Sequence, residues 1–234
     1  MLLTKLCTPE HIGTHIDAPS HFSERGLTVD EIPLKNLMFV PAVVIDIRKK
    51  VKKNIIYQLT AKDVVEWVEE YGLFPNNSVV LVLTGWSSRY QDKVAYFGHA
   101  SDPKKFIFPG VGVDAVQTIL GYRNTSGINV VGIGLDTPSI DYGPSQIFRS
   151  HQEVAQANVY VLENLKNIES LQPKGMELMI VPLKLKGGSG SPCRVFARPQ
   201  ASDTSESDSN GCKEMKSNLL LPFILLIVIL RLYR

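Results

Sequence analysis

Residues 11–21 read His-Ile-Gly-Thr-His-Ile-Asp-Ala-Pro-Ser-His, so three of the five histidines in the chain and one aspartate fall within eleven positions. Imidazole nitrogens and carboxylate oxygens together form the ligand set of hydrolytic zinc and manganese sites. For a single histidine, an ordinary surface loop would be the better interpretation. Four such side chains flanked by Gly, Thr and Pro favour a metal site and metal-assisted hydrolysis.

The spacing of this run favours an extended segment over a helix. Gly13, Thr14 and Pro19 all disfavour a helix. In a strand, His15 and Asp17 lie two apart on the same side, and His11 lies two further alternations back. We therefore expect these three side chains to face one metal. His21 follows the proline and is expected near the metal without ligating it, where a general acid or base is needed.

The rest of the chain up to about residue 190 alternates short apolar runs with amphipathic segments, which is typical of an α/β domain. Thr60 is the expected N-cap of a helix that ends near Tyr71, and Gly72 is its stop. A second helix is expected from Val113 to near Gly121. The expected strands are residues 41–47, 78–84, 129–135, 158–162 and 176–185. Polar motifs then lie at strand ends and in the adjoining loops, where the sites of α/β folds usually lie.

The run from His11 to Phe22 resembles the H-x-G-T-H-x-D-x-P-x-H signature of the cyclase-like metal hydrolases, a family that includes bacterial kynurenine formamidase and isatin hydrolase. Further stretches resemble the family in the same order: Thr84-Gly85-Trp86, Phe108-Pro109-Gly110 and Leu135-Asp136-Thr137-Pro138-Ser139-Ile140-Asp141. The resemblance spans residues 8 to about 186. Family members usually carry a few dozen more residues before the signature, so we expect this N-terminally short chain to be either an alternative or incomplete gene product or a protein that lacks that part of the substrate pocket.

The resemblance implies a fold and a set of site residues. The expected fold is a single cyclase-like α/β domain of the swivelling β/β/α type, with a mixed sheet, over residues 1–198. His11, His15 and Asp17 would hold one metal, and Asp17 would bridge to a second metal held with the last two site residues, His151 and Glu163. His21 would be the catalytic acid/base. The expected cofactor is Zn²⁺ or Mn²⁺ in a two-metal site. On local sequence alone, His151 could equally be an ordinary helix histidine, whereas Glu163 follows a buried strand, where an unpaired carboxylate is costly.

The activity implied by the resemblance is that of a metal-dependent amidase. The metal would polarise the amide carbonyl and activate a water, and His21 would carry the proton to the leaving amine. The expected substrate is an aryl formamide such as N-formylkynurenine, whose hydrolysis yields kynurenine in tryptophan catabolism, or a related cyclic amide. The alternative is a non-catalytic, metal-containing, membrane-anchored binding module. The resemblance also implies a homodimer.

Charge and cysteines exclude several other functions. The chain has 25 basic and 23 acidic residues, a net charge of +2, and no nucleic-acid-binding motif, so no nucleic-acid partner is expected. The basic run at residues 48–53 is expected to be a charged loop, with contact to an anionic surface as the weaker alternative. Three scattered cysteines indicate neither a disulfide framework nor a thiolate metal site, and Cys7 is expected to be a small buried residue. Aromatic residues after the second strand would either line a pocket or, as we prefer, fill the core; these are Trp86, Tyr90, Tyr96 and Phe97.

The composition changes near the C-terminus. Residues 199–218 are expected to form a polar, disordered linker, and residues 219–234 a hydrophobic tail. Twelve consecutive apolar positions are too few to span a bilayer comfortably. The pattern matches a GPI-attachment signal with Ser209, Asn210 or Gly211 as the attachment residue, and a tail anchor is the alternative. We therefore expect membrane association, at the extracellular surface if an upstream signal peptide exists, and otherwise a cytoplasmic or tail-anchored protein.

Overall fold

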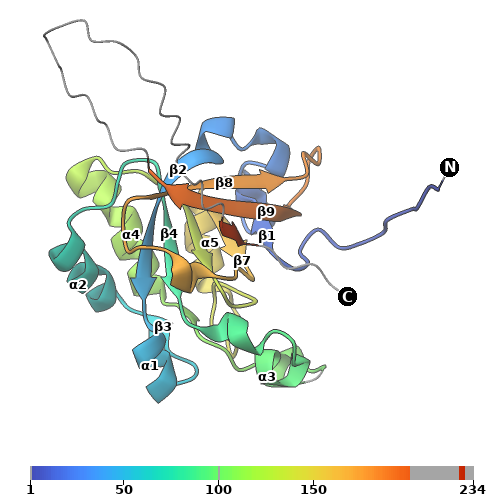
Figure 1. Ribbon diagram of the computed structural model, residues 1–234, viewed down its shortest axis with the longest axis horizontal. Helices are drawn as coiled ribbons and strands as arrows, with labels where there is room; N and C mark the ends of the chain where they lie inside the picture. The colour runs from blue at the N-terminus through green and yellow to red at the C-terminus, as the bar shows by residue number, and fades with distance from the viewer. Residues whose placement is uncertain (1, 100, 201–226, 230–234) are drawn as a thin grey trace, which may run out of the picture.

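A mixed sheet forms the centre of the molecule in the computed structural model, which describes residues 2–99, 101–200 and 227–229 (Figure 1). The strand order is β1-β7-β6-β4-β2-β8-β9-β10. Because β1 also pairs with β9, all of these strands except β10 close into a ring. A separate two-stranded sheet joins β3 to β5. The strands are β1 His15–Asp17, β2 Met38–Asp46, β3 Gln58–Leu59, β4 Ser78–Leu83, β5 Gly110–Val111, β6 Val130–Leu135, β7 Tyr160–Glu163, β8 Met176–Pro182, β9 Gly190–Pro199 and β10 Ile227–Ile229. The helices are α1 Arg48–Lys53, α2 Ala61–Tyr71, α3 Lys93–Phe97, α4 Val113–Ser126 and α5 Arg149–Gln156, with short 3-10 turns between elements.

The parallel half of the sheet consists of β2, β4, β6 and β7. Its strands are rich in β-branched residues that alternate between two hydrophobic clusters. Val44 and Leu81 point into the closed ring, whereas Val43 and Val80 pack with residues of α2 and α4. A strand buried on both faces has no polar alternation, which is why these segments read as continuous apolar runs. Figure 1 shows α2 and α4 on one flank of this half.

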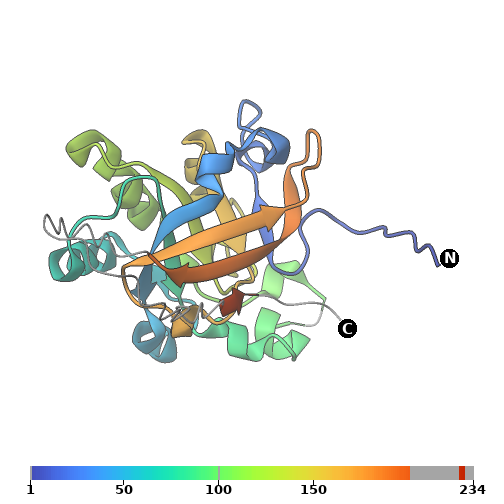
Figure 2. The same cartoon turned by 45° about the horizontal axis from the view of Figure 1, so that its top comes forward.

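Strand β1 carries the motif and sits between two other strands. It pairs antiparallel with β7, where His15 lies opposite Glu163, and antiparallel with β9, where His15 lies opposite Pro192. Figure 2 shows β8 and β9 curving across the face of the parallel strands to reach it. The closed ring therefore places the motif beside the carboxyl end of β7.

The mixed α/β domain expected from the sequence is confirmed, and so is the helix α2. The Thr60 side chain accepts a hydrogen bond from the Asp63 N–H, and Gly72 follows the last turn at a φ of 78°. Strands β2, β4, β6, β7 and β8 form at the expected positions, although their ends differ by up to a few residues.

Two expectations about local structure are wrong, and one long strand was missed. The basic run at residues 48–53 is the helix α1 rather than a loop, because Val51 is buried in the core and Lys50 is paired with Asp63. Helix α4 continues past Gly121 and ends before Gly127, which adopts the left-handed conformation. Strand β9 was not predicted, since Gly and Pro stand at its two ends, although Cys193 to Arg198 alternate between buried and more exposed side chains.

The chain ends differ from the sequence expectations in one respect. Cys7 is exposed rather than buried, because residues 2–9 run along the outside of the molecule. Of the expected linker and hydrophobic tail, residues 201–226 and 230–234 lie outside the described residues, whereas residues 199–200 and β10 are described, and the backbone of β10 pairs with β9. Among the helices that the structure describes, none has the length and apolar character to cross a bilayer.

Candidate metal centre and active site

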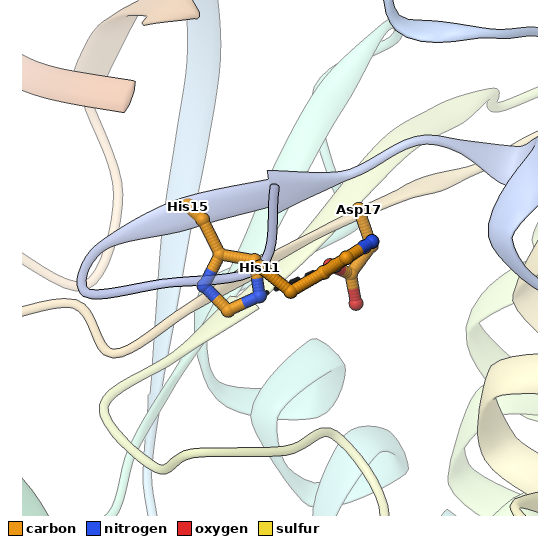
Figure 3. A group of neighbouring side chains, drawn as sticks. All are labelled: His11, His15 and Asp17. Atoms are coloured by element: carbon orange, nitrogen blue, oxygen red, sulfur yellow. Dashed lines mark hydrogen bonds and ion pairs between the residues drawn. The ribbon is translucent and has the colours of Figure 1, made fainter. Parts of the chain in front are cut away.

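The first group of candidate ligands comes from β1 and the turn before it (Figure 3). His15 and Asp17 both point to one side of the short strand, as their spacing predicts, and Gly13 before them adopts a φ of 61°. This left-handed residue turns the chain so that His11 comes back over β1. The Oδ1 atom of Asp17 lies 2.6 Å from His11 Nδ1 and 3.1 Å from His15 Nε2.

A second group forms around the other oxygen of the same aspartate. His151 comes from α5, and Glu163 is the last residue of β7. The Oδ2 atom of Asp17 lies 3.4 Å from His151 Nε2, which in turn lies 3.3 Å from Glu163 Oε1. In each group, the potential ligand atoms all lie within 4.8 Å of one another. The structure thus brings together five residues that span more than 150 positions of the sequence.

The histidines in both groups are held by the nitrogen that faces away from the cluster. His15 Nδ1 lies 2.9 Å from the Gly13 carbonyl oxygen, and His151 Nδ1 lies 2.7 Å from Asp141 Oδ2. His11 Nε2 lies 3.0 Å from Ser189 Oγ, which itself donates to Glu10 Oε2 at 2.7 Å. Such partners take the ring N–H and leave the opposite nitrogen free as a metal ligand.

The electrostatics of the cluster favour a bound cation. Burial alone would lower the pKa of His15, but the hydrogen bond to Asp17 and the charges of Asp17 and Glu163 raise it to about 9. Burial would raise the pKa of Asp17, yet hydrogen bonds from His11, His15 and His151 hold it well below its usual range. Burial and the nearby Asp17 charge raise the pKa of Glu163. Two buried carboxylates this close can both be ionised only if positive charge lies between them.

The donor set fits a divalent metal such as zinc or manganese. Two ligands about 2.1 Å from a tetrahedral ion are about 3.4 Å apart. The separations of His15 from Asp17 and of His151 from Asp17 and Glu163 are 3.1, 3.4 and 3.3 Å. Nitrogen and oxygen ligands without a thiolate match the preferences of both ions. His11, His15 and Asp17 could hold one ion, and Asp17, His151 and Glu163 could hold another.

His21 lies beside this cluster and belongs to neither group of potential ligands. Its ring stacks on that of His11 at a centroid distance of 3.9 Å and lies 6.2 Å from the His151 ring. The surrounding side chains partly desolvate the imidazole and, with the neighbouring histidines, lower the pKa of His21 to about 4. The side chain is therefore close enough to exchange a proton with a molecule bound at the cluster.

A cavity of about 470 Å³ opens onto the cluster, and five potential ligands and His21 form its floor. Its walls are largely aromatic, contributed by Phe22, Tyr90, Phe97, Phe106, Phe108, Tyr142 and Phe148. The expectation that the aromatic residues after β4 fill the core is therefore confirmed for two of the four residues and wrong for the other two. Trp86 and Tyr96 are buried in the core, whereas Tyr90 and Phe97 are partly buried and line the cavity.

Three residues that support the cluster have no role that the sequence alone predicts. Asp141 ends the D-T-P-S-I-D stretch, so the motif marked its position but not its contact with His151. Glu10 and Ser189 lie 179 positions apart, and Ser189 precedes the unpredicted strand β9. Only the closure of the ring by β1 and β9 brings them together.

The family of the chain follows from comparison with known proteins. The Cyclase family model, described as "Putative cyclase", matches residues 4–142. The chain belongs to this family. Isatin hydrolase from Roseibium aggregatum is 30% identical over 197 residues, which cover 80% of this chain and 71% of that protein. Kynurenine formamidase from Geobacillus thermodenitrificans is 29% identical over 191 residues, with 80% and 76% covered.

Solved structures show the same relationship. Isatin hydrolase A from Ralstonia solanacearum superimposes with a TM-score of 0.72 at 36% identity, covering 80% of this chain and 72% of that structure. The cyclase-like hydrolase family expected from the sequence is thus confirmed, and the chain is a hydrolase that acts on carbon–nitrogen bonds. The relatives give no support to the alternative of a non-catalytic membrane-anchored module.

Proposed function

We propose that this protein is a metal-dependent amidase for small aryl amides, with an aryl formamide such as N-formylkynurenine as substrate or a related cyclic amide such as isatin. The observation that carries the proposal is the position of the cluster. Five potential ligands and His21 form the floor of a cavity whose walls are aromatic. A planar aromatic substrate would stack on these walls and present its amide to the floor.

The residues would have three separate roles in the reaction. His11, His15, Asp17, His151 and Glu163 would hold the metal, and a bound divalent ion would supply Lewis-acid polarisation of the carbonyl and acidify the attacking water. The His21 imidazole, which needs no ligand role, would accept the proton of that water and deliver it to the leaving nitrogen. Phe22 and Phe148 lie beside His151 at ring distances of 4.5 and 6.1 Å and would shield this region from bulk water.

We further propose a two-metal site of Zn²⁺ or Mn²⁺, with Asp17 as the bridge. Its two oxygens face different partners, Oδ1 towards His11 and His15 and Oδ2 towards His151. A carboxylate in this position can contribute one oxygen to each ion.

The test is an assay of purified full-length protein with N-formylkynurenine and with isatin, after chelation and after addition of Zn²⁺ or Mn²⁺. We expect turnover of one of the two that depends on the added metal and is lost in His21→Ala. The Phe148→Leu variant should instead raise KM with a smaller change in kcat, because it alters the wall rather than the proton transfer. Metal binding without turnover of either substrate would refute the substrate class, and failure to bind metal would refute the site.

A homodimer and a C-terminal membrane anchor remain proposals of their own. The molecular mass of the purified protein in solution tests the first, with a value near 52 kDa, twice the 26.0 kDa of one chain, as the expected result. Fractionation of cells that express the full chain tests the second.

A further inference from the structure

A second cavity, of about 550 Å³, is lined by the 3-10 helix η4, Trp86–Arg89. Residues of η4 line this second cavity, whereas Tyr90, the next residue, lines the catalytic cavity. The segment after β7 divides in the same way, since Asn164 lines the catalytic cavity and Lys166 the second one. The second cavity contains none of the candidate metal ligands.

The charges around this second cavity are mostly positive. Arg48, Lys52, Arg89 and Lys166 line it, and Glu169 is its single carboxylate. Arg48 is paired with Asp46, but the other three cations have no ion pair within the part of the chain that the structure describes. Three unpaired cations around one hollow repel each other, and a bound anion would relieve that repulsion.

The local structure positions two of these cations. Arg48 and Lys52 lie four residues apart on helix α1 and therefore on the same face of it, and both line the cavity. The aliphatic stem of Arg48 lies against Gly85, which has a φ of 79°, and a Cβ at Gly85 would lie 3.3 Å from Arg48 Cγ. The guanidinium of Arg89 lies over the Trp86 ring at 4.0 Å. This stacking holds the planar guanidinium and leaves its N–H groups available.

We propose that this second cavity is a binding site for a small multivalent anion that carries phosphate or carboxylate groups. The guanidinium of Arg89 would make paired hydrogen bonds to the anion, and Lys52 and Lys166 would neutralise its remaining charge. The floor lies at the carboxyl end of the parallel strand β4, a common position for ligands in α/β folds. Two residues of the basic run at 48–53, Arg48 and Lys52, then have a role apart from the hydrolytic site.

The test is calorimetric titration of the full-length protein with inorganic phosphate and, separately, with succinate, at constant ionic strength set by NaCl. Each of Arg89→Gln and Lys52→Gln is expected to weaken binding about tenfold, the effect of one charge-assisted hydrogen bond. Lys49→Gln is the matched control, because Lys49 lies on the same helix and carries the same charge but does not line the cavity. The control should change affinity less than about twofold. Trp86 fluorescence should change with the same saturation curve, because the anion would contact the guanidinium that covers its ring.

The relative affinities of phosphate and succinate identify which acid group the site prefers. Three results would overturn the proposal: no saturable binding of either anion, equal weakening by Lys49→Gln and Lys52→Gln, or binding that survives Arg89→Gln and disappears when metal is removed. The last result would assign the anion to the metal cluster. None of these results depends on whether the protein hydrolyses an amide, so the proposal can fail separately from the proposed function.

Discussion

Replacing Ser189 with alanine is expected to loosen the metal held by His11. Ser189 Oγ lies 3.0 Å from His11 Nε2 and donates its own proton to Glu10 Oε2 at 2.7 Å. The serine oxygen is therefore available to accept the Nε2–H, which holds the His11 ring with Nδ1 towards Asp17. In the alanine variant, the ring N–H loses its acceptor in a partly buried position, at a cost of about 1–3 kcal/mol.

This cost translates into a metal affinity that is about 10- to 100-fold weaker, the usual effect of removing a group that orients a ligand. Competition titration with a chromophoric chelator measures it directly. Ser189→Thr keeps the hydroxyl and should restore most of the affinity. Ser170→Ala is the matched control, since this serine donates to a backbone carbonyl far from the cluster. An affinity for Ser189→Ala within about twofold of wild type would refute the assignment of Ser189 as a positioning residue.

Three further predictions concern the same site and the fold. Gly190→Ala should weaken metal binding at least as much as Ser189→Ala in the same titration, because the new Cβ would lie 2.4 Å from His11 Cε1 and displace the ring; an unchanged affinity would contradict this geometry. Asp63→Asn should reduce the free energy of unfolding in urea by about 1–3 kcal/mol at pH 7. The reason is that the buried carboxylate accepts hydrogen bonds from Lys50, from the Tyr57 hydroxyl and from the backbone N–H of Thr60, the N-cap of α2. Burial opposes ionisation of Asp63, but these hydrogen bonds lower its pKa below the usual value. Its contribution to the free energy of unfolding is therefore complete above the unfolded pKa of about 3.9 and is lost as the pH falls through the folded pKa. The difference between wild type and Asp63→Asn should therefore shrink below about pH 4, and a difference that stays constant would refute the ionic origin.

The sequence predicts those parts of the fold that depend on local chemistry. Thr60 and Asp63 cap α2 through contacts three residues apart, and the apolar runs of β4 and β6 are buried on both faces. Helix α1 escapes prediction because its stability comes from distant contacts. One buried valine and the pairing of Lys50 with Asp63 hold a helix that otherwise consists of basic residues.

The same difference between local and long-range contacts explains which residues of the candidate site could be predicted. His11, His15 and Asp17 are close in sequence, and strand alternation with one left-handed glycine is enough to bring them together. His151 and Glu163 come from α5 and β7, so only resemblance to the family could include them before the structure was known. Glu10 and Ser189 had no signal at all, because their contact depends on the pairing of β1 with β9, two strands that are far apart in the sequence.

The most direct test of the account is the comparison of Asp17→Asn with wild type in metal content and amide hydrolysis. The asparagine keeps the size of the side chain but removes the charge on which both groups of potential ligands converge. We expect the variant to fold, as judged by circular dichroism, to bind less metal and to lose at least about three orders of magnitude in turnover, or about 4 kcal/mol of barrier. Turnover of Asp17→Asn within about tenfold of wild type would contradict the claim that this cluster is the catalytic centre.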